Sequence, residues 1–187
     1  SLLGSQDGLG HLALTLADPG DVVLVPDPSY PIFRHGPLLA GAELYDMPMR
    51  PENDWVIDVS AIPEDVARRA KLMIVSYPNN PVTRIAPDSF YREVIAFAKK
   101  YDIAVLHDNA YGELVFDGRQ TESFLSYEGA RDVGIEFTSL SKTYGMAGTR
   151  VGFAFGNQKM IGALANLKSN LDYGIFLPIQ KAAIAAV

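Results

Sequence analysis

The sequence contains no cysteine, and this absence excludes disulfide bonds and thiolate metal sites. No apolar stretch approaches the roughly 18 residues that a membrane-spanning helix needs. The three histidines, His11, His35 and His107, lie far apart, so no pair has the spacing of metal ligands. We therefore expect a soluble, cytoplasmic protein without a metal centre.

Basic clusters are also missing. Lysine and arginine number 16 against 22 aspartate and glutamate residues, which gives a net charge of −6. An acidic chain without a basic run is poorly suited to bind nucleic acid, because neutralising phosphates requires clustered cations. No strand-like run is followed by Gly-x-Gly-x-x-Gly, so a dinucleotide-binding Rossmann domain is excluded as well.

The two ends of the chain lack the signals that usually begin and end a domain. Residues 4–8 predict a loop that enters a helix over 9–16, with no preceding strand to hold it. Residues 175–187 predict an apolar helix that ends without a glycine or polar cap. We therefore expect residues 1–187 to be the middle of a longer chain.

Between these ends, β-branched apolar runs alternate with helical patterns. Strands are expected at 22–25, 42–45, 72–75, 103–106, 133–140 and 151–155. Helices are expected at 30–40, 63–70, 87–100 and 157–171. Because several strands are continuous apolar runs, the pattern predicts an α/β fold of three layers, with a mostly parallel sheet covered by helices on both faces.

In such sheets, polar residues just past the carboxyl ends of the strands line the ligand crevice. A first cluster, Gly-Ser-Gln at 4–6, begins a helix, where free N–H groups favour a phosphate; simple helix capping is the alternative. A second, residues 77–81, presents two asparagines between prolines, or is an ordinary turn. A third, residues 108–111, places Asp108 in an apolar setting, where a carboxylate needs a cationic or proton-donating partner. Asp108 as a helix N-cap is the alternative.

The fourth cluster, residues 139–152, is the most specific. Lys142 follows a predicted strand, between hydroxyl side chains and among small, apolar neighbours. A lysine in such a place can act as an amine nucleophile. Ser139, Ser141 and Arg150 can hold a phosphate, the arginine in bidentate fashion. A structural lysine in a loop is the alternative.

Together the four clusters resemble the large domain of a fold-type I, pyridoxal 5′-phosphate (PLP)-dependent aminotransferase of class I/II. The resemblance covers essentially the whole chain, with the motifs in the family's order. It implies that Lys142 bonds covalently to PLP and that Asp108 pairs with the pyridine nitrogen. It also implies that Tyr30 stacks on the ring, and that Asn80 and Tyr111 hydrogen-bond its hydroxyl oxygen.

The remaining residues that the resemblance implies surround the cofactor's phosphate. They are Ser5, Gln6, Ser139, Ser141 and Arg150. The resemblance assigns catalytic roles to Lys142, Asp108 and Tyr111, and it implies a homodimer with the active site at the interface.

Within this family the chain most resembles the LL-diaminopimelate aminotransferases of bacterial lysine biosynthesis. The phrases that carry this likeness are residues 20–28, 67–73, 97–103, 133–137 and 140–144. The resemblance implies transamination of LL-diaminopimelate, with 2-oxoglutarate as acceptor, by the parent enzyme. The chain departs from the family's usual residues at Val82, Thr83, Gly145, Ala147 and Thr149, positions that concern substrate contacts.

Members of the family are longer than this chain. The resemblance therefore implies that residues 1–187 are the PLP-binding large domain, without the N-terminal segment and without the small C-terminal domain that carries the arginine for the substrate carboxylate. Two alternatives remain open. One is a carbon–sulfur lyase or aminocyclopropane-carboxylate synthase with the same cofactor ligands; the other is a catalytically silent, cofactor-binding fragment.

Overall fold

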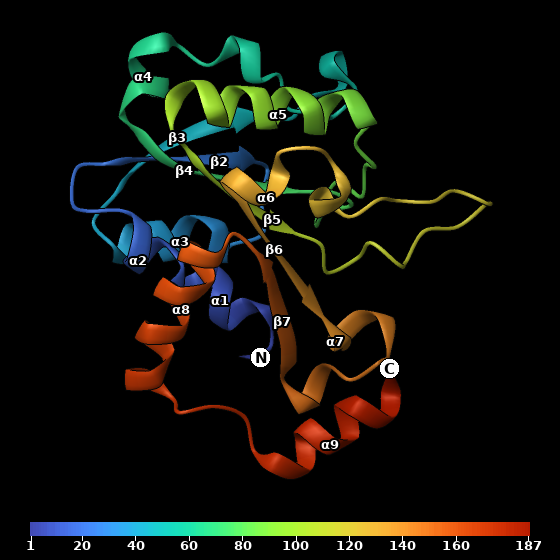
Figure 1. Ribbon diagram of the computed structural model, residues 1–187. Helices are drawn as coiled ribbons and strands as arrows, with labels where there is room; N and C mark the ends of the chain where they lie inside the picture. The colour runs from blue at the N-terminus through green and yellow to red at the C-terminus, as the bar shows by residue number, and fades with distance from the viewer.

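The computed structural model describes all residues from 1 to 187 and shows one seven-stranded sheet between two layers of helices (Figure 1). The strand order is β1-β7-β6-β5-β4-β2-β3. The strands are β1 (Leu2–Leu3), β2 (Val22–Asp27), β3 (Glu43–Pro48), β4 (Ala70–Ser76), β5 (Ala104–Asp108), β6 (Gly134–Ser139) and β7 (Val151–Gly156). Strands β2 to β6 run parallel, whereas β7 is antiparallel to both β6 and β1, so the predicted mostly parallel sheet is confirmed.

The helices divide between the two faces of the sheet. Those on one face are α4 (Glu64–Arg69), α5 (Asp88–Tyr101) and α6 (Ala130–Val133) (Figure 1). Those on the other are α1 (Ser5–His11), α2 (Ala13–Leu16), α3 (Ile32–Leu39) and α8 (Gln158–Leu171). A short helix, α7 (Leu140–Thr143), follows β6, and α9 (Leu177–Ala186) ends the chain. No helix combines the length and the apolar character that crossing a membrane requires.

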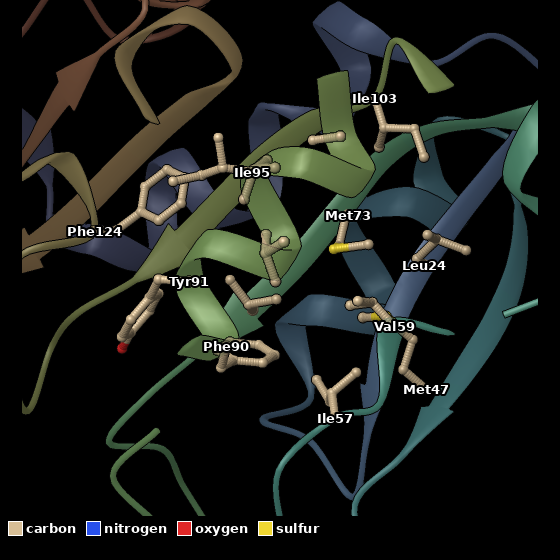
Figure 2. Close-up of a cluster of buried hydrophobic side chains, with 14 of the residues drawn as sticks. Leu24, Met47, Ile57, Val59, Met73, Phe90, Tyr91, Ile95, Ile103 and Phe124 are labelled. Atoms are coloured by element: carbon tan, nitrogen blue, oxygen red, sulfur yellow. The ribbon is translucent and has the colours of Figure 1, made fainter. Parts of the chain in front are cut away.

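Each face of the sheet has its own hydrophobic core. Figure 2 shows the first, in which Phe90 and Ile95 of α5 pack over Leu24 and Met73 of the sheet. Apolar residues recur on one side of α5 at helical spacing, which is why this helix buries that side against the strands. On the opposite face, Leu9 and Phe33 of the helices pack against Phe137 of β6 in a second core.

The predicted helix over residues 9–16 differs from the structure in two ways. Helix α1 begins earlier, at Ser5, and the helix is interrupted at Leu12 before α2 begins at Ala13. The expectation that no strand precedes this helix is wrong, because Leu2 and Leu3 pair with β7. A two-residue strand is too short to give an alternating pattern in the sequence.

The other predicted strands and helices are present, with shifted ends. Strand β2 continues through Pro26, although proline has no backbone N–H to donate to a neighbouring strand. The pairing of β2 with β4 covers only Val22, Val23 and Leu24, so no hydrogen bond to β4 is lost at Pro26. Helices α6 and α7 were not predicted, since four residues show no helical period. Lys142 therefore lies in a short helix and not in a loop.

The first core should dominate stability. Leu24 is completely buried, so we expect Leu24→Ala to lower the free energy of unfolding by about 2–5 kcal/mol through lost burial and a cavity. Leu39 is 73% exposed and offers a matched control. Leu39→Ala should change the free energy of unfolding by less than about 0.5 kcal/mol. Urea unfolding of both variants checks this; equal effects would contradict the assignment of the core.

Candidate active site

The carboxyl ends of three neighbouring strands place polar side chains next to one another. Ser76 ends β4 and lies opposite Asp108, which ends β5. Asp108 in turn lies opposite Phe137 of β6, two residues before Ser139. Ser76, Asp108 and Ser139 are all buried, so this edge of the sheet forms the floor of a polar site.

A cavity of about 180 Å³ opens above this floor. All ten residues that the sequence assigned to a cofactor site line it: Ser5, Gln6, Tyr30, Asn80, Asp108, Tyr111, Ser139, Ser141, Lys142 and Arg150. They come from α1, the loop after β2, the ends of β4, β5 and β6, α7 and the approach to β7. The fold therefore brings segments from across the chain to one point.

Asp108 is the acidic end of this cavity. Its carboxylate is buried, and its Oδ1 atom has no hydrogen-bond partner within the protein. Burial raises the pKa of Asp108 to about 6, although His107 and the backbone N–H of Ala110 act in the opposite direction. A buried carboxylate with a free oxygen is suited to a positively charged or proton-donating ligand atom.

The opposite end of the cavity is rich in hydrogen-bond donors. Gly4 has φ +74°, and a Cβ there would lie 2.2 Å from Arg150 Nη2, so only glycine lets the guanidinium approach the start of α1. A Cβ on Gly152 would lie 2.5 Å from the backbone nitrogen of Ser5. These two glycines allow Arg150 and the first residues of α1 to share one anion-binding corner.

The two serines of the fourth motif have different surroundings. Ser139 Oγ accepts a hydrogen bond from Ser141 N at 3.1 Å and donates to Val151 O at 3.3 Å, so it caps α7. Arg150 Nη1 donates to Ala147 O at 2.8 Å and lies 3.4 Å from Ser141 Oγ. Of the two hydroxyls, that of Ser141 lies beside the guanidinium and is the better placed to share an anion with it.

Lys142 and Tyr111 face each other across the cavity. Lys142 Nζ lies 5.5 Å from the centroid of the Tyr111 ring, within range of a cation–π contact. Lys142 is exposed, so the small, apolar surroundings expected for it are not formed by residues 1–187. The amine is therefore accessible on the open side of the cavity.

The remaining predicted residues are Gln6, Tyr30 and Asn80. Tyr30 Oη donates a hydrogen bond to Gln6 Oε1 at 2.9 Å, which links the loop after β2 to the start of α1. Asn80 lies exposed at the mouth of the cavity. It also lines a second, adjoining cavity of about 610 Å³, together with Tyr111 and Thr83.

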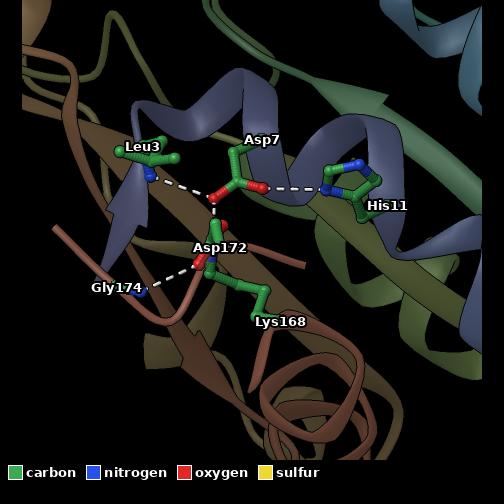
Figure 3. Close-up of polar contacts among 6 residues, drawn as sticks. All are labelled: Leu3, Asp7, His11, Lys168, Asp172 and Gly174. Atoms are coloured by element: carbon green, nitrogen blue, oxygen red, sulfur yellow. Dashed lines mark hydrogen bonds and ion pairs between the residues drawn. The ribbon is translucent and has the colours of Figure 1, made fainter. Parts of the chain in front are cut away.

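A polar cluster that the sequence did not predict connects helix α1 to helix α8. Asp7 accepts hydrogen bonds from Leu3 N at 2.9 Å and His11 Nδ1 at 2.8 Å, and it pairs with Lys168 of α8 (Figure 3). Lys168 also pairs with Asp172. Burial alone would raise the pKa of Asp7, but the hydrogen bond from Lys168 and those from Leu3 and His11 hold it below its usual value. Asp7 and Lys168 are 161 residues apart, so no local signal links them.

Four residues line the cavity without having been predicted as cofactor contacts. They are Leu9, Ser76, Ala110 and Ala147. Ser76 had a usable signal, because it directly follows a buried apolar run and so stands at the carboxyl end of a strand. The other three are apolar, and only the folded chain places them there.

Comparison with known proteins finds relatives that are aminotransferases. The model of the family described as aminotransferase class I and II matches residues 2–187. An LL-diaminopimelate aminotransferase from Moorella thermoacetica is 51% identical over 187 residues, all of this chain and 48% of the relative. One from Dehalococcoides mccartyi is 52% identical over 186 residues, with the same shares. The chain thus spans about half the length of the curated relatives that it matches.

Solved structures agree with these relatives. Substrate-bound BacF from Bacillus subtilis is 43% identical, with a TM-score of 0.95 over 99% of this chain and 47% of that one. An aminotransferase from Staphylococcus aureus is 39% identical, with a TM-score of 0.94 over 99% of this chain and 49% of that one. The three-layer fold of residues 1–187 is therefore the one that these proteins share.

The raised pKa of Asp108 has a measurable consequence for stability in the ligand-free chain. The pKa rises from 3.8 to about 6 on folding, so the protonated side chain is favoured in the fold. This favourable contribution is fully present below pH 3.8 and is lost as the pH rises through about 6. Asp108→Asn should therefore stabilise the ligand-free chain at pH 7.5, on the order of 2–3 kcal/mol, and by much less near pH 4.

Thermal or urea unfolding at the two pH values measures this difference. Asp18→Asn, at an exposed position, is the control and should have little effect at either pH. A destabilised Asp108→Asn variant at pH 7.5, or a difference that does not change with pH, would contradict the assignment.

Proposed function

The chain belongs to the class I and II aminotransferase family, and from that premise we propose that its polar cavity binds PLP and supports transamination. The observation that carries the proposal is the distribution of charge within one cavity. A buried, unpartnered carboxylate oxygen lies at one end, a guanidinium beside backbone N–H groups lies at the other, and a lysine amine is accessible between them. These groups match the ring nitrogen, phosphate and aldehyde of PLP.

The proposed contacts follow from this match. Asp108 Oδ1 would accept a hydrogen bond from the protonated ring nitrogen and so keep that nitrogen protonated. Arg150, Ser141 and the first backbone N–H groups of α1 would neutralise the phosphate charge. The ring of Tyr30 would stack against the cofactor, and its hydrogen bond to Gln6 fixes its orientation.

Two further residues would act on the ring's hydroxyl oxygen. Asn80 can donate a hydrogen bond from its amide, and Tyr111 from its phenol. Both side chains lie on the wall shared by the two cavities, so they also separate the cofactor from the space beside it. This position fits residues that orient both cofactor and substrate.

Lys142 is the reactive amine of the proposal. PLP, when bound, supplies the electron sink that makes the Cα–H bond of an amino acid acidic. The Nζ of Lys142 would first hold the cofactor covalently and, once displaced by the substrate's amine, would be free to move the Cα proton as a general base. Its exposure on the open side of the cavity would make the amine accessible to an entering substrate.

For the amino donor we propose LL-diaminopimelate, with 2-oxoglutarate as acceptor. The support is that relatives 51% and 52% identical to the chain are LL-diaminopimelate aminotransferases. Because the chain spans 48% of these relatives, the activity is proposed for the whole protein. The adjoining cavity, with polar Thr83 and charged Arg119 in its walls, offers additional space beside the proposed cofactor site.

A second copy of the chain is part of the same proposal. The end of the chain presents large apolar side chains to solvent, with Phe176 exposed by 73%, Leu177 by 61% and Ile184 by 75%. Helix α9 packs mainly against β7 (Figure 1). The three side chains are left uncovered by the rest of the chain. Apolar surface of this kind is typical of an interface, and the homodimer is proposed for the whole protein.

A product assay tests the proposed reaction. The PLP-loaded protein, incubated with LL-diaminopimelate and 2-oxoglutarate, should form glutamate, whereas Lys142→Ala should reduce the rate at least about a hundredfold because general acid–base catalysis is lost. Lys159→Ala, which alters an exposed lysine of α8 outside both cavities, is the matched control and should keep the activity.

Different products identify the alternatives. Ammonia and a thiol released from a sulfur-containing amino acid, without glutamate, would contradict transamination and favour a carbon–sulfur lyase. No product from either substrate, despite bound PLP, would leave a cofactor-binding protein without turnover and would also contradict the proposal.

A further inference from the structure

Glu136 of β6 is a buried carboxylate that lies outside the proposed cofactor cavity. Its Oε2 accepts hydrogen bonds from His107 Nδ1 at 2.9 Å and from Phe124 N at 2.8 Å. Its Oε1 accepts hydrogen bonds from Ser123 Oγ at 2.9 Å and from Asn109 Nδ2 at 3.3 Å. Burial would raise the pKa of Glu136, but the hydrogen bonds from His107, Ser123 and Asn109 lower it, so this carboxylate is ionised and only accepts.

Two of these four donors flank Asp108 in the sequence. Along β5 successive side chains point to opposite faces of the sheet, so His107 lies on the face of α5 while Asp108 lies on the cavity side. His107 is opposite Glu136 in the strand register, and the ladder continues beyond Asp108 with Asn109 N donating to Phe137 O at 2.8 Å. Glu136 therefore accepts hydrogen bonds from both sequence neighbours of Asp108, His107 and Asn109, on the face of the sheet opposite the cavity.

We propose that Glu136 is a positioning residue, which fixes the backbone on both sides of Asp108 and so aims the Asp108 carboxylate into the cavity. The proposal rests on the proposed function, since it assigns the Asp108 carboxylate to the cofactor's ring nitrogen. The contact of Asp108 with the ring nitrogen would then also depend on Glu136, which lies on the opposite face of the sheet.

The surroundings of Asn109 support a dedicated role for this contact. Its Oδ1 has no partner, so the hydrogen bond to Glu136 is the only polar contact of the Asn109 side chain. A Cβ on Gly112 would lie 2.2 Å from Asn109 Oδ1, so the following loop fits closely around this side chain. Asp108 Oδ1 has no partner, and the hydrogen bond that the carboxylate accepts comes from the backbone N–H of Ala110, so the direction of the Asp108 side chain is tied to the backbone around it.

Glu136 also bonds the 3₁₀ helix η3 (Phe124–Ser126) and the residue before it, which provides a matched control. Glu136→Gln keeps the size of the side chain but replaces one acceptor oxygen with a donor, so the contacts on one oxygen are lost. Ser123→Ala removes a donor to the same carboxylate without touching the neighbours of Asp108. Asp108→Asn provides the reference for a lost carboxylate.

The experiment compares the affinity of the chain for PLP with its affinity for the analogue in which carbon replaces the ring nitrogen. The ratio of the two dissociation constants isolates the contact of Asp108 with that nitrogen. In the unchanged chain we expect PLP to bind at least about tenfold more tightly, as one charge-assisted hydrogen bond provides. Glu136→Gln should reduce this preference at least about threefold, toward the value for Asp108→Asn, whereas Ser123→Ala should preserve it.

A purely structural role for Glu136 gives a different result. Glu136→Gln would then weaken binding of PLP and of the analogue by the same factor, the preference would stay unchanged, and the proposal would be overturned.

A second measurement needs no cofactor. Three-bond NMR couplings about the Cα–Cβ bond of Asp108 should report one rotamer in the ligand-free chain and in Ser123→Ala, and averaged rotamers in Glu136→Gln. If the unchanged chain binds neither PLP nor the analogue, the proposed function fails, while these couplings still decide the role of Glu136. Identical couplings in all three proteins would overturn it.

Discussion

The burial of the Asp108 carboxylate is the constraint on which the arrangement of the site depends. Removing a carboxylate from water costs free energy unless a partner compensates for it, and Asp108 Oδ1 has no partner within the chain. Two parallel strands, β4 and β6, flank β5 and exclude water from its last residue. The fold therefore buries a carboxylate at a free-energy cost, at a point where a ligand that donates a hydrogen bond can offset that cost.

Both faces of the sheet contribute to keeping this group in place. On the cavity side, α1 presents its first residues beside Arg150, and the ion pair between Asp7 and Lys168 anchors that helix to α8 (Figure 3). On the other side, Glu136 holds the two neighbours of Asp108. A residue on the face of the sheet opposite the cavity thus helps to fix the position of Asp108 inside the cavity.

Much of this organisation is predictable from the sequence, for identifiable physical reasons. Continuous apolar runs indicate buried parallel strands, and polar residues that follow such runs lie at the edge where ligands bind. That rule, together with the family resemblance, identifies Asp108 and Lys142 from the sequence alone. The convergence of all ten assigned residues on one cavity is consistent with these assignments, while their individual roles stay proposals.

The remainder depends on contacts that the sequence does not encode locally. Strand β1 is two residues long and exists because β7 pairs with it. The partnership of Asp7 with Lys168 joins residues 161 positions apart, and Glu136 is a single acidic residue within an apolar strand. The exposure of Lys142 likewise depends on which segments cover the open side of the cavity.

The central claim is that Lys142 holds PLP in this cavity. Borohydride reduction of the PLP-treated chain, followed by peptide mapping with mass spectrometry, tests it most directly. We expect one phosphopyridoxyl group, located on Lys142. A label on another lysine, or no label at all, would contradict it.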